Sequence, residues 1–99
     1  MSARGTIEQA VTSWDGLRTI DLRLDEFNGK PPECKGAVCY MRAEVVRHVW
    51  KHLDHLPRAG ECVMIEGELH WDGHGFLEIH PTRSTDVQIL DSTGGLQSN

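Results

Sequence analysis

The segment IEQAVTSWDGLRTIDLRL, residues 7–24, carries two runs rich in aliphatic and β-branched residues on either side of an Asp-Gly pair. An Asp-Gly pair in this setting is typical of a two-residue type I′ turn that joins two antiparallel strands. Such a turn sets a register in which Trp14 faces Leu17. We therefore expect a β-hairpin with strands at about 4–14 and 17–26.

The side-chain pattern on both strands supports this hairpin. In this register every large aliphatic residue beyond the turn falls on one face, as a half-buried antiparallel pair requires. The opposite face sets Glu8 across from Arg23, a favourable pair of opposite charges. A slip of one residue would destroy both patterns, so the register is a specific prediction.

The later segments complete the expected order of elements. We expect a strand at 35–43, an amphipathic helix at 44–56, and strands at 61–71 and 76–90, the last interrupted near 81–84. The order is then β-β-β-α-β-β. A helix between strands three and four of a five-stranded set is the layout of the OB-fold barrel, which is an all-β fold.

The composition limits the class of protein. The 99 residues correspond to one domain, which we place at 4–91, followed by a disordered polar tail at 92–99. The formal net charge of −5 argues against a protein that grips duplex DNA by charge alone. No segment resembles a signal peptide or a transmembrane helix, so we expect a cytoplasmic protein with reduced cysteines. Cys62 lies in an apolar strand pattern and is expected to be buried and unreactive.

Two Trp-Asp-Gly tripeptides, at Trp14 and Trp71, stand at the two turns that flank the ligand groove of an OB-fold. Phe76 follows the second turn. Exposed rings at the lips of a groove suit single-stranded nucleic acid, because bases stack on them at about 1–3 kcal/mol each. The alternative is that these rings pack against the protein. For Trp14 packing and stacking are equally good interpretations, and for Trp71 packing is the better one. Phe76 would then plug the end of the barrel.

Basic residues on the second and third expected strands, and on the loop between them, are the candidate phosphate contacts. They are Arg18, Lys35 and Arg42. Acidic residues interleave with them, so a solvated face of mixed charge is the alternative interpretation.

The segment RAGECVMIEGELH, residues 58–70, resembles the fourth strand of the bacterial single-stranded DNA-binding protein (SSB) and primosomal replication protein B-like OB-fold family. The matching residues are Arg58, Gly60, Val63, Ile65, Glu66, Gly67 and Leu69. The resemblance implies an SSB-like OB-fold that binds single-stranded DNA. It also places Tyr40 where the family has a base-stacking tryptophan at the start of its third strand.

Three histidines, His48, His52 and His55, would share one stripe of the expected helix. Such a stripe can bind a transition metal, but it is also what a polar helix flank looks like, and we expect the latter. We therefore expect no metal and no cofactor. The sequence shows no nucleophile–base pair, phosphate-binding loop or paired catalytic carboxylates, so we expect no enzyme.

These features predict a protein that binds single-stranded nucleic acid, DNA more than RNA, as an accessory in replication, recombination or repair. The stacking set is Trp14, Tyr40, Trp71 and Phe76, and the phosphate set is Arg18, Lys35 and Arg42. SSB-like relatives associate through barrel strands, so we expect a homodimer or homotetramer. The alternative is an OB-fold subunit that binds other proteins and has lost the basic groove.

Overall fold

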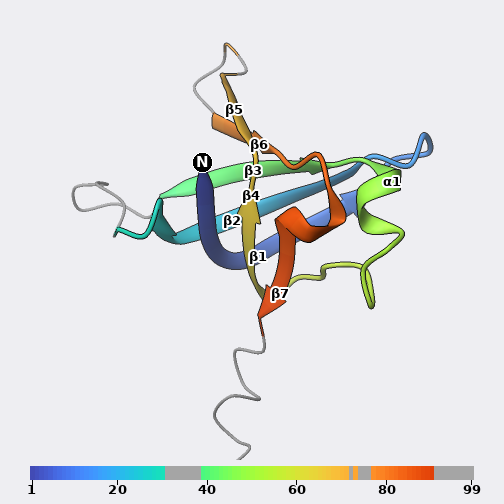
Figure 1. The fold of residues 1–99 in the computed structure, drawn as a ribbon, viewed down its shortest axis with the longest axis horizontal. Coiled ribbons are helices and arrows are strands. Elements are labelled where there is room, and N and C mark those ends of the chain that lie inside the picture. The colour runs from blue at the N-terminus through green and yellow to red at the C-terminus, as the bar shows by residue number, and fades with distance from the viewer. Residues whose placement is uncertain (31–38, 72, 74–76, 91–99) are drawn as a thin grey trace, which may run out of the picture.

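Figure 1 shows the computed structural model of the chain, which describes residues 1–30, 39–71, 73 and 77–90. Strands make up most of it. The elements in chain order are β1 (Ser2–Thr12), β2 (Arg18–Phe27), β3 (Tyr40–Val45), α1 (Arg47–Trp50), β4 (Cys62–Glu66), β5 (Glu68–Trp71), β6 (Leu77–His80), the 3-10 turn η1 (Ser84–Asp86) and β7 (Val87–Leu90). The tail expected at 92–99 lies outside the described residues.

The seven strands form one sheet in the order β5-β6-β3-β2-β1-β4-β7. Neighbouring strands are antiparallel except for β3 and β6, which run parallel. Only Gly67 separates β4 from β5, yet β4 pairs with β1 and β7 whereas β5 pairs with β6 at the opposite end of the order. The sheet must therefore curl round on itself, and the strong bend of β1 in Figure 1 follows this curl. The architecture is all-β and OB-like.

The expected five-stranded barrel is wrong in its details. The strand expected at 61–71 breaks at Gly67, and the strand expected at 76–90 breaks at Pro81 and η1. A Cβ on residue 67 would lie 2.4 Å from the His80 carbonyl oxygen, so glycine is what lets the two backbones approach here. Each half of a broken strand pairs with a different neighbour, and the seven-stranded sheet does not close.

The first hairpin has a loop of three residues rather than two. The Ser13 N–H donates to the Leu17 carbonyl at 2.8 Å, and Gly16 is the loop residue with a positive φ, of 92°. This is a type I turn followed by a glycine bulge. The expected type I′ turn and its register are therefore wrong: Ser13 rather than Trp14 lies opposite Leu17, and Ala10 lies opposite Ile20.

A β-bulge in β1 returns the apolar side chains of the hairpin to the core face. The register shifts between Ile7 and Gln9, and this bulge turns Ile7 back to the core face, opposite Leu22. The expected charge pair also forms, with Arg23 Nη1 3.4 Å from Glu8 Oε2. The hairpin, its apolar face and its ion pair are confirmed, although the exact register is not.

Helix α1 is much shorter than the helix expected at 44–56, because it spans only Arg47–Trp50. β3 continues to Val45, which pairs with Arg18 of β2. Sheet pairing thus overrides the helical spacing of the apolar residues before α1. Val49 is fully buried, as the helical pattern implied. In the described part of the chain, no helix is long and apolar enough to cross a membrane.

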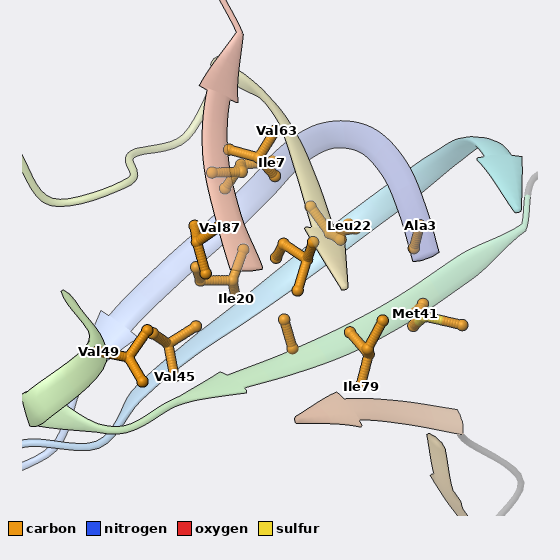
Figure 2. Packing of buried hydrophobic residues seen from close by; sticks show 12 residues of the cluster. Ala3, Ile7, Ile20, Leu22, Met41, Val45, Val49, Val63, Ile79 and Val87 are labelled. Carbon is orange, nitrogen blue, oxygen red and sulfur yellow. The ribbon is translucent and has the colours of Figure 1, made fainter. Parts of the chain in front are cut away.

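The core lies inside the curl of the sheet, and α1 packs at one end of it. Figure 2 shows side chains that enter it from most of the strands and from α1. Its buried members are Ala3, Ile7, Ile20, Leu22, Met41, Ala43, Val45, Val49, Val63, Ile65, Ile79 and Val87. Because side chains alternate along a strand, the residues between these members on β2, β3 and β6 face outwards. The candidate site is built on that outer face.

The cysteines differ from expectation in two ways. Cys39 is buried and disulfide-bonded, so the expectation of reduced cysteines is wrong. Cys62 carries a free thiol and is partly rather than fully buried. Desolvation raises the pKa of the Cys62 thiol, which lowers its thiolate fraction and slows its reaction with thiol reagents.

Candidate nucleic-acid interface

Trp14 stands at the tip of the β1–β2 loop and is 99% exposed. Hydrogen bonds inside the loop hold its shape: the Ser13 hydroxyl donates to the Asp15 carboxylate, and the Leu17 N–H donates to Asp15 Oδ1 at 3.2 Å. These bonds favour the ionised carboxylate and lower the pKa of Asp15. Since the ring is so exposed, the interpretation of Trp14 as a packing residue finds no support.

Helix α1 supports this loop from behind. Trp50 donates its Nε1–H to the Gly16 carbonyl at 2.8 Å. The Arg47 side chain lies against the same glycine, because a Cβ added to Gly16 would be 3.4 Å from Arg47 carbon atoms. Arg47 therefore brings a cation to the Trp14 loop. Sequence reasoning missed it, because no local pattern relates Arg47 to a turn so far away in the chain.

Arg18 does not face an open groove. It is 9% exposed, and its Nε and Nη2 donate to the Pro57 carbonyl at 3.0 and 2.6 Å. Its Nη1 donates to the Thr12 hydroxyl at 2.7 Å. The enclosed guanidinium ties the end of the first hairpin to the chain that follows α1, and this is a structural role.

Tyr40 and Arg42 lie two residues apart on β3, so both side chains are on the outer face of the sheet. Tyr40 is 55% exposed. Together they line a hollow of about 420 Å³, to which β1 and β2 contribute acidic and amide side chains. Arg42 Nε donates to Asp21 Oδ1 at 3.0 Å, and this bond raises the pKa of the guanidinium. The hollow combines an exposed aromatic ring with a partly neutralised arginine.

Trp71 is 64% exposed at the end of β5, opposite Leu77 of β6. It lies on the same face of β5 as Leu69, which packs against the core, and therefore faces away from the side that carries His70. The structure does not bring Trp71 onto the face of Tyr40 and Arg42. Lys35 and Phe76, the remaining predicted site residues, lie outside the described residues.

A second hollow, of about 390 Å³, lies between the base of the first Trp-Asp-Gly loop and the β5–β6 ribbon. Leu17 lines it from the first loop and His70 from β5 of the ribbon. Glu44 on β3 and His80 on β6 also line it. Its walls are therefore acidic and imidazole-bearing rather than basic. No sequence pattern points to this cluster, because its members are far apart in the chain.

The three histidines around α1 do not form the expected helical stripe. α1 ends at Trp50, so His52 and His55 lie beyond it. His48 Nε2 lies 3.2 Å from the Thr82 carbonyl oxygen. These positions are therefore separate surface sites and not three ligands on one helix face.

Ion pairs occupy most of the described basic side chains. The paired residues are Arg4, Arg23, Arg42, Arg58 and Arg83. Among the described residues, Lys30, Arg47 and Lys51 are outside any ion pair and Arg18 is enclosed. Two of the three unpaired cations belong to α1 or its last turn. Of these unpaired cations in the described part of the chain, Arg47 lies beside the Trp14 loop, where it is available to a phosphate.

Comparisons with known proteins agree with this architecture. The solved structure of the Plasmodium falciparum SSB complex with ssDNA superposes with a TM-score of 0.62 and 22% sequence identity. The match covers 92% of this chain and 93% of that chain. No family model matches the sequence, and no curated protein matches it. The likeness extends over nearly the whole chain and shows an SSB-like OB-fold.

Proposed function

We propose that this chain binds single-stranded nucleic acid, DNA more than RNA, along the outer face of β3 from Tyr40 to the Trp14 loop. The observation that carries the proposal is the exposure of Trp14, a large apolar ring held in water on an ordered loop. Isolated exposed apolar residues are common, but a tryptophan at 99% exposure leaves its whole ring available to stack on a base. The fold supports the proposal, since a protein of similar fold has been solved as a complex with ssDNA.

The spacing of the two rings suits a short stretch of single strand. β3 runs from Tyr40 to Val45, and Val45 pairs with Arg18 at the foot of the Trp14 loop. At about 3.3 Å per residue the two ends of β3 are about 17 Å apart. A strand that crosses this distance would span several nucleotides, within the site sizes of about 4–16 nucleotides known for OB-folds.

The charge distribution suggests where the phosphates lie. Arg42 is near the Tyr40 end but is bonded to Asp21. Arg47 stands at the Trp14 end, and neither Arg47 nor Lys51, which follows α1, has an ion pair among the described residues. We therefore assign the main phosphate contacts to α1 and its last turn, and no longer to Arg18.

The test is a titration of intrinsic tryptophan fluorescence with oligo-dT at low salt. Arg47→Ala should weaken binding and reduce the slope of log K against log salt by about 0.7, the value for one lost phosphate contact on a single strand. Arg58→Ala is the matched control, because it removes the same charge from an exposed arginine that is already paired with Glu61. A flat titration with the unaltered chain would overturn the proposal.

A subunit that binds other proteins is the competing function. The net charge of −5 and the many paired arginines favour it, because they weaken attraction to phosphate. If this is the function, the tryptophan fluorescence should not change on addition of oligo-dT, even at the lowest salt. The same titration therefore separates the two.

The wider role follows from the proposed binding. We propose a non-catalytic accessory of replication, recombination or repair that acts as a homodimer or homotetramer. β5 and β7 are the two edges of the sheet, and unpaired edges gain from association. Light scattering at high micromolar concentration should give two or four chains, and a monomer would contradict this.

A further inference from the structure

We propose that Glu44, Glu78 and His80 form a binding site for a divalent transition-metal ion of the Zn²⁺ type. The three side chains come from the neighbouring strands β3 and β6, at the second hollow described above. One ligand atom from each lies within 4.8 Å of the others. The site is independent of the proposed nucleic-acid binding and can be tested without any oligonucleotide.

The parallel pairing of β3 with β6 creates this cluster. The register sets Arg42 beside Glu78 and Ala43 beside Ile79, so the next positions, Glu44 and His80, are also neighbours. Glu78 and His80 are two residues apart and share a face. Since Ala43 and Ile79 are buried in the core, the strands that present the three ligands are held rigidly.

The distances match the coordination shell of a small ion. His80 Nε2 lies 3.1 Å from Glu78 Oε1 and 3.5 Å from Glu44 Oε1. Nitrogen and oxygen ligands stand about 2.0–2.2 Å from Zn²⁺ in a tetrahedral site, which puts neighbouring ligands about 3.3–3.6 Å apart. The two distances from His80 are therefore close to the spacing that a shared ion requires, and the two carboxylates lie within 4.8 Å of each other.

Hydrogen bonding alone satisfies this arrangement poorly. One imidazole nitrogen carries at most one hydrogen, yet His80 Nε2 faces two carboxylate oxygens. The two carboxylates also repel each other, and both are partly buried, with side-chain exposures of 28% for Glu44 and 14% for Glu78. Arg42 lies beside Glu78 and interacts electrostatically with both glutamates, but its one positive charge is shared with Asp21, to which its Nε donates. A bound divalent ion would neutralise both carboxylates and use the imidazole lone pair.

The surroundings of the cluster support an imidazole ligand. The His70 ring stacks on the His80 ring, with centroids 4.1 Å apart and an angle of 16° between planes. This contact fixes the plane of the ligand ring, as groups behind metal ligands commonly do. The adjoining hollow gives an ion access and leaves a fourth position for water. An imidazole with two carboxylates favours Zn²⁺ over Mg²⁺ or Ca²⁺, which prefer oxygen ligands alone.

The experiment is a calorimetric titration of the full chain with Zn²⁺ after treatment with a chelator. We expect one ion per chain, and we expect each of Glu44→Gln, Glu78→Gln and His80→Gln to lower the affinity at least about tenfold. His55→Gln is the matched control, because His55 also lies beside a glutamate, with Nε2 2.5 Å from Glu61 Oε2. Cys62→Ser tests the free thiol. Both controls should keep the affinity of the unaltered chain.

A second measurement does not depend on how well a variant folds. Co²⁺ bound to the unaltered chain should show the visible absorption of a tetrahedral site without the charge-transfer band of a thiolate ligand. Absence of binding, a thiolate band, or equal affinities in the three ligand variants and the unaltered chain would overturn the proposal.

Discussion

Trp14 and Trp71 each precede an Asp-Gly pair, but the two segments occupy different settings. Their glycines have similar positive φ angles, 92° at Gly16 and 84° at Gly73. Behind Gly16 stand α1 and the indole of Trp50, which hydrogen-bonds its carbonyl. Around Gly73 a Cβ would meet no atom of the described residues within 4 Å. The same tripeptide therefore makes a supported loop in one place and the end of a two-stranded ribbon in the other.

The same turn motif therefore does not determine where its tryptophan lies or how exposed the ring is. In the first segment Trp14 lies at the loop tip, outside either strand, and it is wholly exposed. In the second, Trp71 is the last residue of β5 and is paired with Leu77. Strand alternation then places Trp71 on the side of Leu69. Four predictions test this difference, and we give them in order of expected effect.

The largest effect is expected at the support of the first hairpin. Arg18→Ala should lower the free energy of unfolding by about 2–4 kcal/mol, because it leaves the Pro57 carbonyl and the Thr12 hydroxyl without their partner. Leu77→Ala on the second ribbon should cost less than about 1 kcal/mol, because Leu77 is 37% exposed. Urea denaturation measures both losses. Similar losses at the two sites would contradict the difference in support.

The next effect separates the two tryptophans in binding. Trp14→Ala should weaken oligo-dT binding by about 1–3 kcal/mol, the range for one stacked base, and leave stability unchanged. Trp71→Ala should weaken binding by less than about 0.5 kcal/mol, because its ring faces away from Tyr40 and Arg42. Fluorescence anisotropy of labelled oligo-dT measures both. A larger loss at Trp71 would place the binding surface on the other face of the ribbon.

A smaller effect tests the hydrogen bond behind the first loop. Trp50→Phe keeps most of the ring but removes the N–H that reaches the Gly16 carbonyl, so we expect a loss of about 1 kcal/mol in unfolding free energy. Trp71→Phe is the matched change on the second ribbon and should cost less than about 0.5 kcal/mol. Urea midpoints of the two variants decide this. An unchanged midpoint for Trp50→Phe would mean that α1 does not support the loop.

The smallest effect is the titration of Asp15. Its pKa in the folded chain is lowered below the ordinary 3.8 by the hydrogen bonds from Ser13 and Leu17. A lowered pKa contributes stability above pH 3.8, and this contribution is lost as the pH falls through the folded pKa. NMR titration of the Asp15 carboxyl carbon should show the lowered value. Ser13→Ala should move it back toward 3.8, and a value that does not change would contradict the loop geometry.

Much of the fold could be predicted from local pattern. The alternation in β2 correctly identified Ile20 and Leu22 as inward residues, because a strand whose core face is wrong would bury charge. The motif around Gly67 indicated an SSB-like OB-fold, which the structural likeness shows. The register of the first hairpin was missed, since Asp-Gly fits both a two-residue and a three-residue loop. The helix was overestimated, because pairing of Val45 with Arg18 competes with helical spacing.

The candidate site was less predictable than the fold. Tyr40 and Trp14 are exposed as the stacking hypothesis requires. Arg18 carries the positive charge that a phosphate contact needs, but its guanidinium is bonded to the Pro57 carbonyl. Only the folded chain brings Pro57 near Arg18. Arg47 is the opposite case: the sequence did not predict it as a site residue, but the packing of α1 on the loop places it beside Gly16.

The sequence by itself determined an all-β chain, an apolar inner face, two turns marked by Trp-Asp-Gly, and a net negative charge. These are local properties, set by side-chain period, glycine conformation and composition. Only the tertiary structure decided which loop is supported, which arginine is buried, and that Glu44 meets Glu78 and His80. Such meetings depend on strand order and register. Those are set by the packing of the whole sheet, because a strand takes whichever neighbour buries the most apolar surface.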